Sequence, residues 1–222
     1  MRLLIPLKGS GLKTRLLNPH DVYWDARLGI HTFGHLDSGI SDGRYYGAAS
    51  YRSLRRVFDA IELKPDDVIV DIGCGFGRPL FFAVDQYKVR QAYGIEANAN
   101  FAQTMRSNIT KFRGNKEVIT VVETYAQEYD YRHATVIYLY NPFGAETMIE
   151  VLEKIYQSLT RYPRPLIIAY LNPIERACFD NCQWLEETEC FYQHQLPTLQ
   201  VGGSLPEGTP VATIYRSKAE LG

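Results

Sequence analysis

The chain has 222 residues, of which 45% are hydrophobic and 22% charged, and its formal net charge is −1. This length and composition suit one α/β domain with a sizeable core, and they exclude an intrinsically disordered chain. The near-neutral charge provides no general field that would attract nucleic acid, so we do not expect a nucleic-acid partner. No segment reaches the roughly 20 apolar residues that span a bilayer, and the apolar run at the start is too short for a secretory signal. We therefore expect a soluble, cytoplasmic protein without a membrane partner.

The chain has four cysteines, which we expect to be reduced thiols because no secretory signal is present. Cys178 and Cys182 are four residues apart and would share a face of a helix. A metal site would need them together with Cys190 and a fourth ligand such as His194. Because there is no Cys-x-x-Cys pair, we predict no metal site and treat Cys178 and Cys182 as packing residues.

Residues 1–44 contain glycines and prolines at short intervals, which predicts an irregular N-terminal arm or cap. The main domain is expected to cover residues 45–222. Within residues 1–44, His31, His35 and Asp37 could line the substrate side.

Helices and strands alternate from about residue 48 onward. In chain order we predict a helix at 48–61, a strand at 68–71, a helix at 79–87, a strand at 92–95, a helix at 98–112, strands at 118–123 and 135–140, a helix at 145–159, a strand at 165–171, a short helix at 174–181, and strands at 185–193 and 209–216. Five strands that alternate with helices indicate a parallel sheet covered on both faces. The last two strands have no helix between them and predict an antiparallel hairpin at one edge. The expected fold is a doubly wound α/β fold with a mostly parallel, seven-stranded sheet.

A glycine-rich loop follows the first strand of this pattern. The sequence Asp71-Ile-Gly73-Cys74-Gly75-Phe-Gly77 places an acid two residues before the first glycine. A dinucleotide site would have Gly-x-Gly-x-x-Gly, but here the third glycine comes one residue early and Arg78 follows it. The Asp71 carboxylate would repel a pyrophosphate, whereas it can pair with the ammonium group of a methionine moiety. Glu96 ends the next strand, where an acid can accept hydrogen bonds from both ribose hydroxyls.

Residues 67–98 resemble the cofactor motifs of class I S-adenosylmethionine-dependent methyltransferases, whose seven-stranded fold ends in an antiparallel hairpin. The resemblance implies that S-adenosylmethionine is the cofactor. It implies that the backbone of Gly73–Gly77, with Cys74 and Gly75, lies along the methionine and ribose. Asp71 would hold the amino group, and Glu96, with Ala97 beside it, the ribose. Contact with adenine would come from Tyr125 or the backbone of Ala126.

The fourth strand of the parallel sheet runs into Asn141-Pro142-Phe143. This Asn-Pro-aromatic sequence resembles the motif of amino-methyltransferases. The resemblance implies that the Asn141 oxygen accepts a hydrogen bond from the substrate amine and that Phe143 packs against the substrate. Acceptors on the N–H groups keep the lone pair of the amine directed at the methyl carbon. Nucleic-acid enzymes usually carry a second proline, which is missing here.

A second resemblance covers the residues before the glycine loop. Tyr46-Gly47 followed by a helix resembles the lead-in of the non-SET histone-lysine methyltransferases, although Ala48 replaces an acid of that family. It implies that Tyr46 and Tyr51 contribute to a cofactor lid. The stretch from Tyr46 to Pro173 resembles more closely a group of small bacterial methyltransferases of unassigned substrate.

The sequence therefore predicts a methyltransferase whose acceptor is a nitrogen of a small molecule or a protein side chain. Three alternatives stay open: methyl transfer to oxygen or carbon of a small metabolite, a non-catalytic S-adenosylmethionine-binding module on the same fold, and an NAD-dependent oxidoreductase, which the glycine spacing disfavours.

Overall fold

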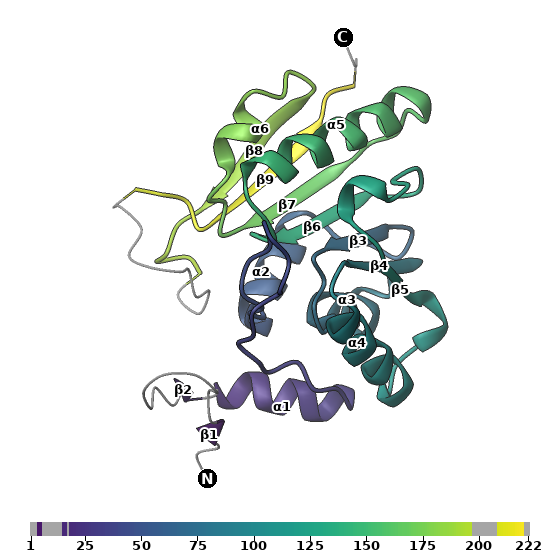
Figure 1. The fold of residues 1–222 in the computed structure, drawn as a ribbon, viewed down its shortest axis with the longest axis vertical. Helices are drawn as coiled ribbons and strands as arrows, with labels where there is room; N and C mark the ends of the chain where they lie inside the picture. The colour runs from purple at the N-terminus through teal and green to yellow at the C-terminus, as the bar shows by residue number, and fades with distance from the viewer. Residues whose placement is uncertain (1–3, 6–14, 17, 197–207, 220–222) are drawn as a thin grey trace.

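The computed structural model describes residues 4–5, 15–16, 18–196 and 208–219. A seven-stranded sheet with the order β5-β4-β3-β6-β7-β9-β8 crosses the molecule (Figure 1). Its parallel part consists of β3 (Val68–Ile72), β4 (Gln91–Glu96), β5 (Ile119–Glu123), β6 (Val136–Tyr140) and β7 (Ile167–Leu171). Strand β9 (Ala212–Ser217) is antiparallel to both β7 and β8 (Leu185–Phe191). The predicted fold class is confirmed, including the antiparallel pair at one edge.

The strand order places a ligand site at the end of β3. After β3 the chain adds β4 and β5 on one side and then returns to add β6 on the other. In open α/β sheets, ligands bind beyond the carboxyl ends of the strands at such a reversal. Both neighbours of β3 are paired in register with it, since Asp71 lies opposite Gly94 and Tyr138. The end of β3 therefore opens between the ends of β4 and β6.

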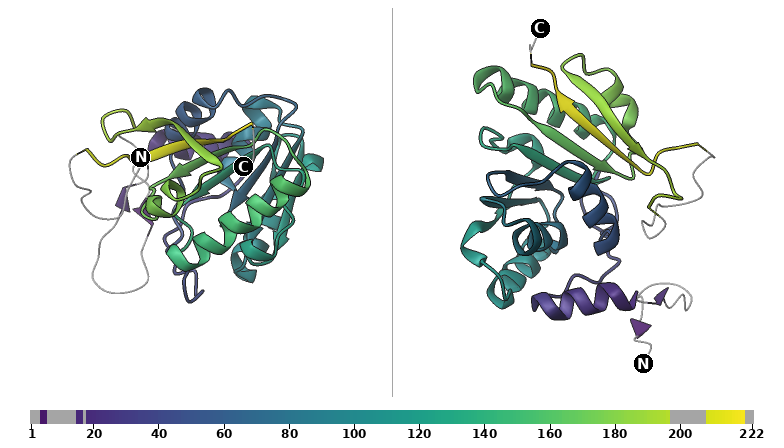
Figure 2. Two further views of the ribbon diagram at one scale, coloured as in Figure 1. Left: turned by 90° about the horizontal axis from the view of Figure 1, so that it is seen from above. Right: turned by 180° about the vertical axis from the view of Figure 1, so that it is seen from behind.

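Helices cover both faces of this sheet (Figure 2). One apolar core is built on the face of α1 (Pro19–Leu28), α2 (Tyr51–Ala60), α3 (Arg78–Tyr87) and α4 (Ala99–Lys111). A second core lies under α5 (Ala145–Arg161) and α6 (Arg176–Asp180). Two 3₁₀ helices lie in the connections on either side of β5: Lys116–Val118 before it and Ala126–Glu128 after it. In the part of the chain that is described, no helix is long and apolar enough to cross a membrane.

Helix α1 corrects one prediction, because residues 19–28 are not irregular. Asn18 caps this helix by accepting a hydrogen bond from the backbone N–H of His20, and Pro19 stands at its start. Gly29 ends it in a left-handed conformation with φ of 77°. This Asn-Pro start and glycine stop are a recognised helix signal. The helix is anchored by Trp24, whose ring stacks on Tyr51 with a centroid distance of 5.6 Å.

The other predicted elements are present, with ends that differ by a few residues. Strands β1 (Leu4–Ile5) and β2 (Arg15–Leu16) form a separate antiparallel pair near the N-terminus that was not predicted. The glycine- and proline-rich connection between the last two strands falls mostly outside the described residues.

Candidate active site

A cavity opens where the strand order reverses. Its walls are the ends of β3, β4 and β6, the loop after β5, and a segment before α2. We call residues 30–47 the lid segment. Of the predicted site residues, the following line this cavity: Tyr46, Asp71, Gly73, Cys74, Gly75, Glu96, Ala97, Tyr125, Ala126, Asn141, Pro142 and Phe143. Residues predicted from five separate stretches of sequence are thus brought to one place.

The glycine loop is clamped between two other segments. Its backbone N–H groups at Gly73 and Cys74 both donate to the carbonyl of Ile95, at 2.9 and 3.0 Å. Gly75 has φ of +53°, and a Cβ atom there would lie 2.4 Å from the Tyr46 ring. A Cβ atom on Gly73 would lie 2.6 Å from Pro142. Glycine is required at these two positions because the lid segment and the end of β6 leave no room for a side chain.

Two buried carboxylates lie at the carboxyl ends of β3 and β4. Asp71 is 2% exposed, and its Oδ2 atom is buried without a hydrogen-bond partner. Burial, and secondarily the charge of Glu96, raise the pKa of Asp71 well above its ordinary value. Glu96 accepts hydrogen bonds from the backbone N–H of Gly75 (2.8 Å) and of Asn98 (2.9 Å), and burial raises its pKa too. A cation placed beside Asp71 would relieve the cost of this buried charge, which suits the amino group of S-adenosylmethionine.

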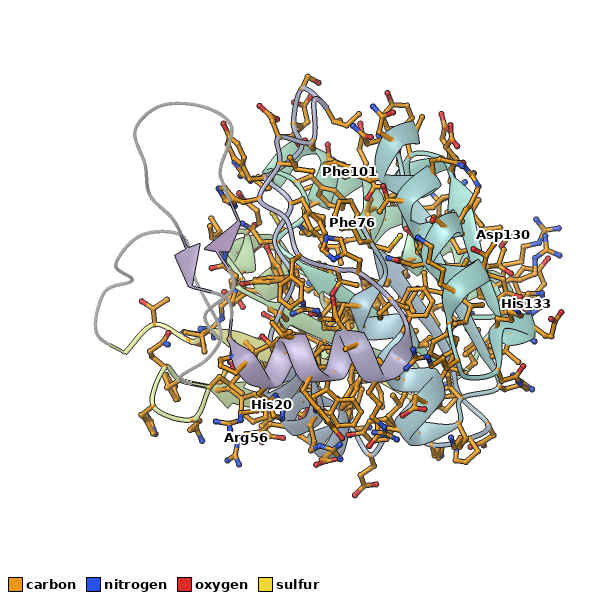
Figure 3. The ribbon with its side chains drawn as sticks, turned by 90° about the horizontal axis from the view of Figure 1, so that it is seen from below. His20, Arg56, Phe76, Phe101, Asp130 and His133 are labelled. Carbon is orange, nitrogen blue, oxygen red and sulfur yellow. The ribbon has the colours of Figure 1, made fainter. Side chains whose placement is uncertain are left out.

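The lid segment is fixed to the rest of the site by hydrogen bonds and ring contacts. The Tyr46 hydroxyl donates to the carbonyl of Thr32 at 2.7 Å, and Asn98 Nδ2 donates to the carbonyl of Ser38 at 2.6 Å. The Tyr46 ring lies 4.1 Å from that of Phe76, which in turn packs edge-on against Phe101 at 5.6 Å. Phe76 and Phe101 lie beside each other in Figure 3. The predicted lid residue Tyr46 therefore covers the glycine loop directly.

Two predicted cofactor residues do not line the cavity. Tyr51 is buried in the core, where its hydroxyl donates to Asp25 Oδ1 at 2.6 Å and its ring stacks on Trp24. The prediction that Tyr51 forms part of a lid does not agree with this position. Gly77, with φ of +85°, starts α3, and a Cβ atom there would meet Phe81 and Met105 instead of the cavity. Its glycine is explained by local backbone conformation and packing.

The end of β6 presents an unpaired oxygen to the cavity. Asn141 has φ of +44°, is 8% exposed, and its Oδ1 atom is buried without a partner. The following residues pair with the lid segment: Arg44 N donates to the carbonyl of Pro142 at 3.0 Å, and Phe143 forms a β-bridge with Gly43. The predicted catalytic strand end and the lid segment thus form one wall.

The loop after β5 forms another part of the cavity wall. Ala126 is 8% exposed, whereas Tyr125 is 49% exposed. Beside them Gln127 also lines the cavity, and its Oε1 atom is buried without a partner. Cys74 is packed inward, with its Sγ atom 3.3 Å from Met105 Sδ.

Sequence reasoning missed four polar residues of the cavity wall: Asp42, Arg78, Gln127 and Tyr138. Each has a buried side-chain atom without a hydrogen-bond partner. Arg78 could have been suspected from its place next to the glycine loop, while Asp42 has no motif that marks it. Among the described residues, no group of three or more His, Cys, Asp or Glu side chains is placed to hold a metal ion.

Comparison with known proteins shows which enzymes the chain is similar to. A family model for the histone methylation protein DOT1 matches residues 40–135. The protein-lysine N-methyltransferase of Saccharolobus islandicus (strain REY15A) is 29% identical over 109 residues, which are 49% of this chain and 67% of the relative.

Solved structures share the fold at low identity. An RNA methyltransferase from Salinibacter ruber in complex with S-adenosyl-L-homocysteine is 19% identical, with a TM-score of 0.52 and coverage of 77% of this chain and 92% of that one. A SAM-dependent O-methyltransferase from Thermotoga maritima is 15% identical, with a TM-score of 0.54 and coverage of 78% and 67%. At such identities only the fold is shared.

The sheet order, the acid before the glycine loop and these relatives define a class I S-adenosylmethionine-dependent methyltransferase. The chain is an enzyme that transfers a methyl group from S-adenosylmethionine to an acceptor.

Proposed function

We propose that the acceptor is an amine nitrogen, and specifically the side chain of a lysine in a protein. The observation that carries this proposal is the Oδ1 atom of Asn141, which lines the cavity at the end of β6 and has no hydrogen-bond partner. An amide oxygen without a donor in a buried place favours a ligand that brings an N–H group. The relative from Saccharolobus islandicus, a protein-lysine N-methyltransferase, supports the same class of acceptor.

A second unpaired oxygen supports a cationic acceptor. Asp42 Oδ2 is buried without a partner and lines the same cavity. Asp42 belongs to the lid segment next to the Gly43–Phe143 bridge, and its carbonyl accepts a hydrogen bond from Gly144 N at 3.2 Å. A carboxylate in this wall would attract an ammonium group, and the amide oxygen of Asn141 would accept from the same nitrogen. A hydroxyl acceptor would bring only one hydrogen and no charge.

The proposal also assigns roles to the residues that bind the cofactor. We infer that Asp71 holds the amino group, that Glu96 holds the ribose hydroxyls, and that Tyr125, Ala126 and Gln127 surround adenine. When bound, S-adenosylmethionine supplies the electrophilic methyl group. Because a lysine ammonium has no lone pair, the bound acceptor must first lose one proton to solvent. The chain itself then has to hold the neutral nitrogen in line with that methyl group, with its lone pair free, and to exclude water.

The test uses cofactor labelled in the methyl group and two matched peptide pools. One pool contains free lysine side chains and the other contains the same sequences with every lysine Nε-acetylated. We expect label in the first pool only, recovered as Nε-methyl-lysine after hydrolysis. Total RNA serves as a third acceptor. Label that is recovered from RNA, or from both peptide pools as an ester or ether, would contradict the proposal.

A further inference from the structure

Tyr45 belongs to the lid segment and lines the cavity, although it is 64% exposed. Its neighbour Tyr46 forms a β-bridge with Leu36 and lies over Gly75. Successive side chains of an extended chain lie on opposite sides, so Tyr45 is directed away from the glycine loop. The Tyr45 ring stacks on that of His35, which is also exposed, with a centroid distance of 5.3 Å and 11° between the ring planes. We call these two rings the aromatic platform, and it lies at the mouth of the cavity.

The aromatic platform lies on the acceptor side of the cavity. Arg44, the residue before Tyr45, donates its backbone N–H to the carbonyl of Pro142 at 3.0 Å. Pro142 follows Asn141, which is 8% exposed and has an Oδ1 atom without a partner. A lysine side chain that reached Asn141 would enter beside Tyr45. The residues next to that lysine in the substrate would stay outside the cavity, where the platform is exposed.

The lid segment around the platform carries more acid than base. Its carboxylates are Asp37 and Asp42, against a single arginine, Arg44, and no lysine. Arg44 is already paired with Glu175, at 2.8 Å. Neither Asp37 nor Asp42 forms an ion pair with a residue that the structure describes. Two acids without a cation, close to an exposed aromatic surface, favour a positively charged partner.

A basic side chain can bind to this surface in two ways at once. The face of a tyrosine ring attracts a cation, and a guanidinium also stacks flat on it. The carboxylates add a longer-range attraction that salt weakens. A nucleobase could stack on Tyr45 too, but the two acids would repel the phosphates beside it. The charges therefore favour a basic protein segment over RNA.

We propose that the aromatic platform binds an arginine or lysine side chain that neighbours the acceptor lysine in the protein substrate. The cation would lie on the exposed surface of the Tyr45 ring, and Asp37 and Asp42 would supply the complementary charge. The preferred substrate is then a protein segment with consecutive basic residues. This inference rests on the proposed function, because it takes the acceptor to be a lysine.

The test uses three peptides with one acceptor lysine each, flanked on both sides by arginine, by glutamine or by leucine. Assays with methyl-labelled cofactor run at pH 8, where histidine side chains are ordinarily neutral, and Nε-methyl-lysine is measured after hydrolysis. We expect kcat/KM for the arginine peptide to exceed that for the glutamine peptide about 5- to 20-fold at low salt, mainly through KM. High salt should reduce this preference. The leucine peptide should stay within about threefold of the glutamine peptide.

Two exposed tyrosines provide the variant and its matched control. Tyr45→Ala should reduce the preference for the arginine peptide to about threefold or less, whereas Tyr45→Phe, which keeps the ring, should keep it. Tyr23 of α1 is 62% exposed and packs edge-on against Trp24, but it does not line the cavity. Tyr23→Ala should therefore keep the full preference.

Two exposed acids test the contribution of charge in the same way. Asp37→Asn keeps the Oδ1 atom that accepts from Gly39 N at 3.0 Å, and it should lower the salt-dependent part of the preference. Asp66 is exposed in the turn before β3, at the opposite edge of the sheet from the cavity. Asp66→Asn should leave the preference and its salt dependence unchanged.

The possible outcomes separate this inference from the proposed function. Equal labelling of the three peptides, a preference for the leucine peptide, or a preference that survives Tyr45→Ala would overturn the inference and leave lysine as the acceptor. Inhibition by an oligouridylate RNA that Tyr45→Ala relieved would assign the platform to nucleic acid and overturn it as well. No label in any of the three peptides would contradict the proposed function itself, and this inference with it.

Discussion

Asn141 and Asn172 are a natural pair for testing the acceptor site at the level of single residues. They follow neighbouring strands, each precedes a proline, and their φ angles are +44° and +49°. Both are buried, and both have an Oδ1 atom without a partner. Left-handed conformations of non-glycine residues carry strain that is often retained at functional sites. Only Asn141 of the two lines the cavity.

We expect Asn141→Ala to lower kcat for an amine acceptor by about 100-fold, because the amine loses the acceptor that orients its lone pair. The Kd of S-adenosylhomocysteine should change by less than about threefold. Asn172→Ala is the control for strain and burial. Asn172→Ala should lower the thermal midpoint about as much as Asn141→Ala does, but it should leave kcat within about twofold of the unmodified protein. Equal losses of kcat in the two variants would show that Asn141 has a structural role only.

Asp71 makes cofactor binding and stability depend on pH. Because burial raises its pKa, the folded protein keeps this proton to a higher pH than the unfolded chain does. The stabilisation is fully present below the unfolded pKa of about 4 and is lost as pH rises through the folded pKa. We therefore expect the free energy of unfolding of the cofactor-free protein to fall as pH rises from the unfolded to the folded pKa of Asp71. Asp71→Asn should abolish this part of the pH dependence. Denaturant titrations of both proteins at several pH values measure the difference.

Cofactor binding should reverse this cost, because the ammonium group favours ionised Asp71. Calorimetry at several pH values above the ordinary pKa of an aspartate, in two buffers of different ionisation enthalpy, should reveal proton release on binding of S-adenosylhomocysteine. The release should be smaller in Asp71→Asn. Proton uptake by the unmodified protein would be the opposite of what the raised pKa of Asp71 requires.

At the level of elements, the lid segment and the glycine loop depend on each other through Tyr46 and Gly75. A Cβ atom on Gly75 would lie 2.4 Å from the Tyr46 ring, and the φ of +53° is itself unfavourable for alanine. We expect Gly75→Ala to weaken binding of S-adenosylhomocysteine by at least about tenfold. Adding Tyr46→Ala should restore part of the loss, since the steric conflict is removed while the backbone strain stays.

Gly47→Ala is the matched control for this experiment. A Cβ atom on Gly47, which also lines the cavity, would have no protein neighbour within 4 Å, so this substitution causes no clash within the protein and should cost much less affinity than Gly75→Ala. Binding by the double variant that is no tighter than binding by Gly75→Ala would show that strain, and not the Tyr46 ring, sets the penalty.

At the level of the whole molecule, the two cores lie on opposite faces of one sheet. Leu28 of α1 is 2% exposed in the first core, and Leu152 of α5 is 4% exposed in the second. Because both cores share the strands between them, we expect a single cooperative unfolding transition. This view places α1 within the domain and not in a detached arm.

We expect Leu28→Ala and Leu152→Ala each to lower the free energy of unfolding by about 2–4 kcal/mol, with one transition retained. Ile149→Ala, on the same helix as Leu152 but 59% exposed, should have an effect of less than about 0.5 kcal/mol. Calorimetric unfolding measures all three. If Leu28→Ala left the main transition unchanged, helix α1 would not unfold together with the sheet.

The sequence by itself determined the sheet, the cofactor loop and the two strand-end acids. These features are local: buried strands, a glycine run and an acid at a strand end are each written within a few neighbouring residues. Parallel strands bring their carboxyl ends to one edge, so the sequence alone predicts that Asp71, Glu96 and Asn141 lie close together. The start of α1 was equally local, and the Asn18-Pro19 cap would have revealed it.

Tertiary structure alone decided which residues face the cavity. Tyr46 and Tyr51 are five residues apart and were both predicted to form a lid, yet one covers Gly75 and the other is buried against Trp24. Arg78 was a mere departure from a glycine pattern until contacts with Thr32, 46 residues away, left one nitrogen unpaired in the cavity. The physical reason is that burial and hydrogen-bond satisfaction are set by which distant segments meet, and neither follows from the spacing of residues along the chain.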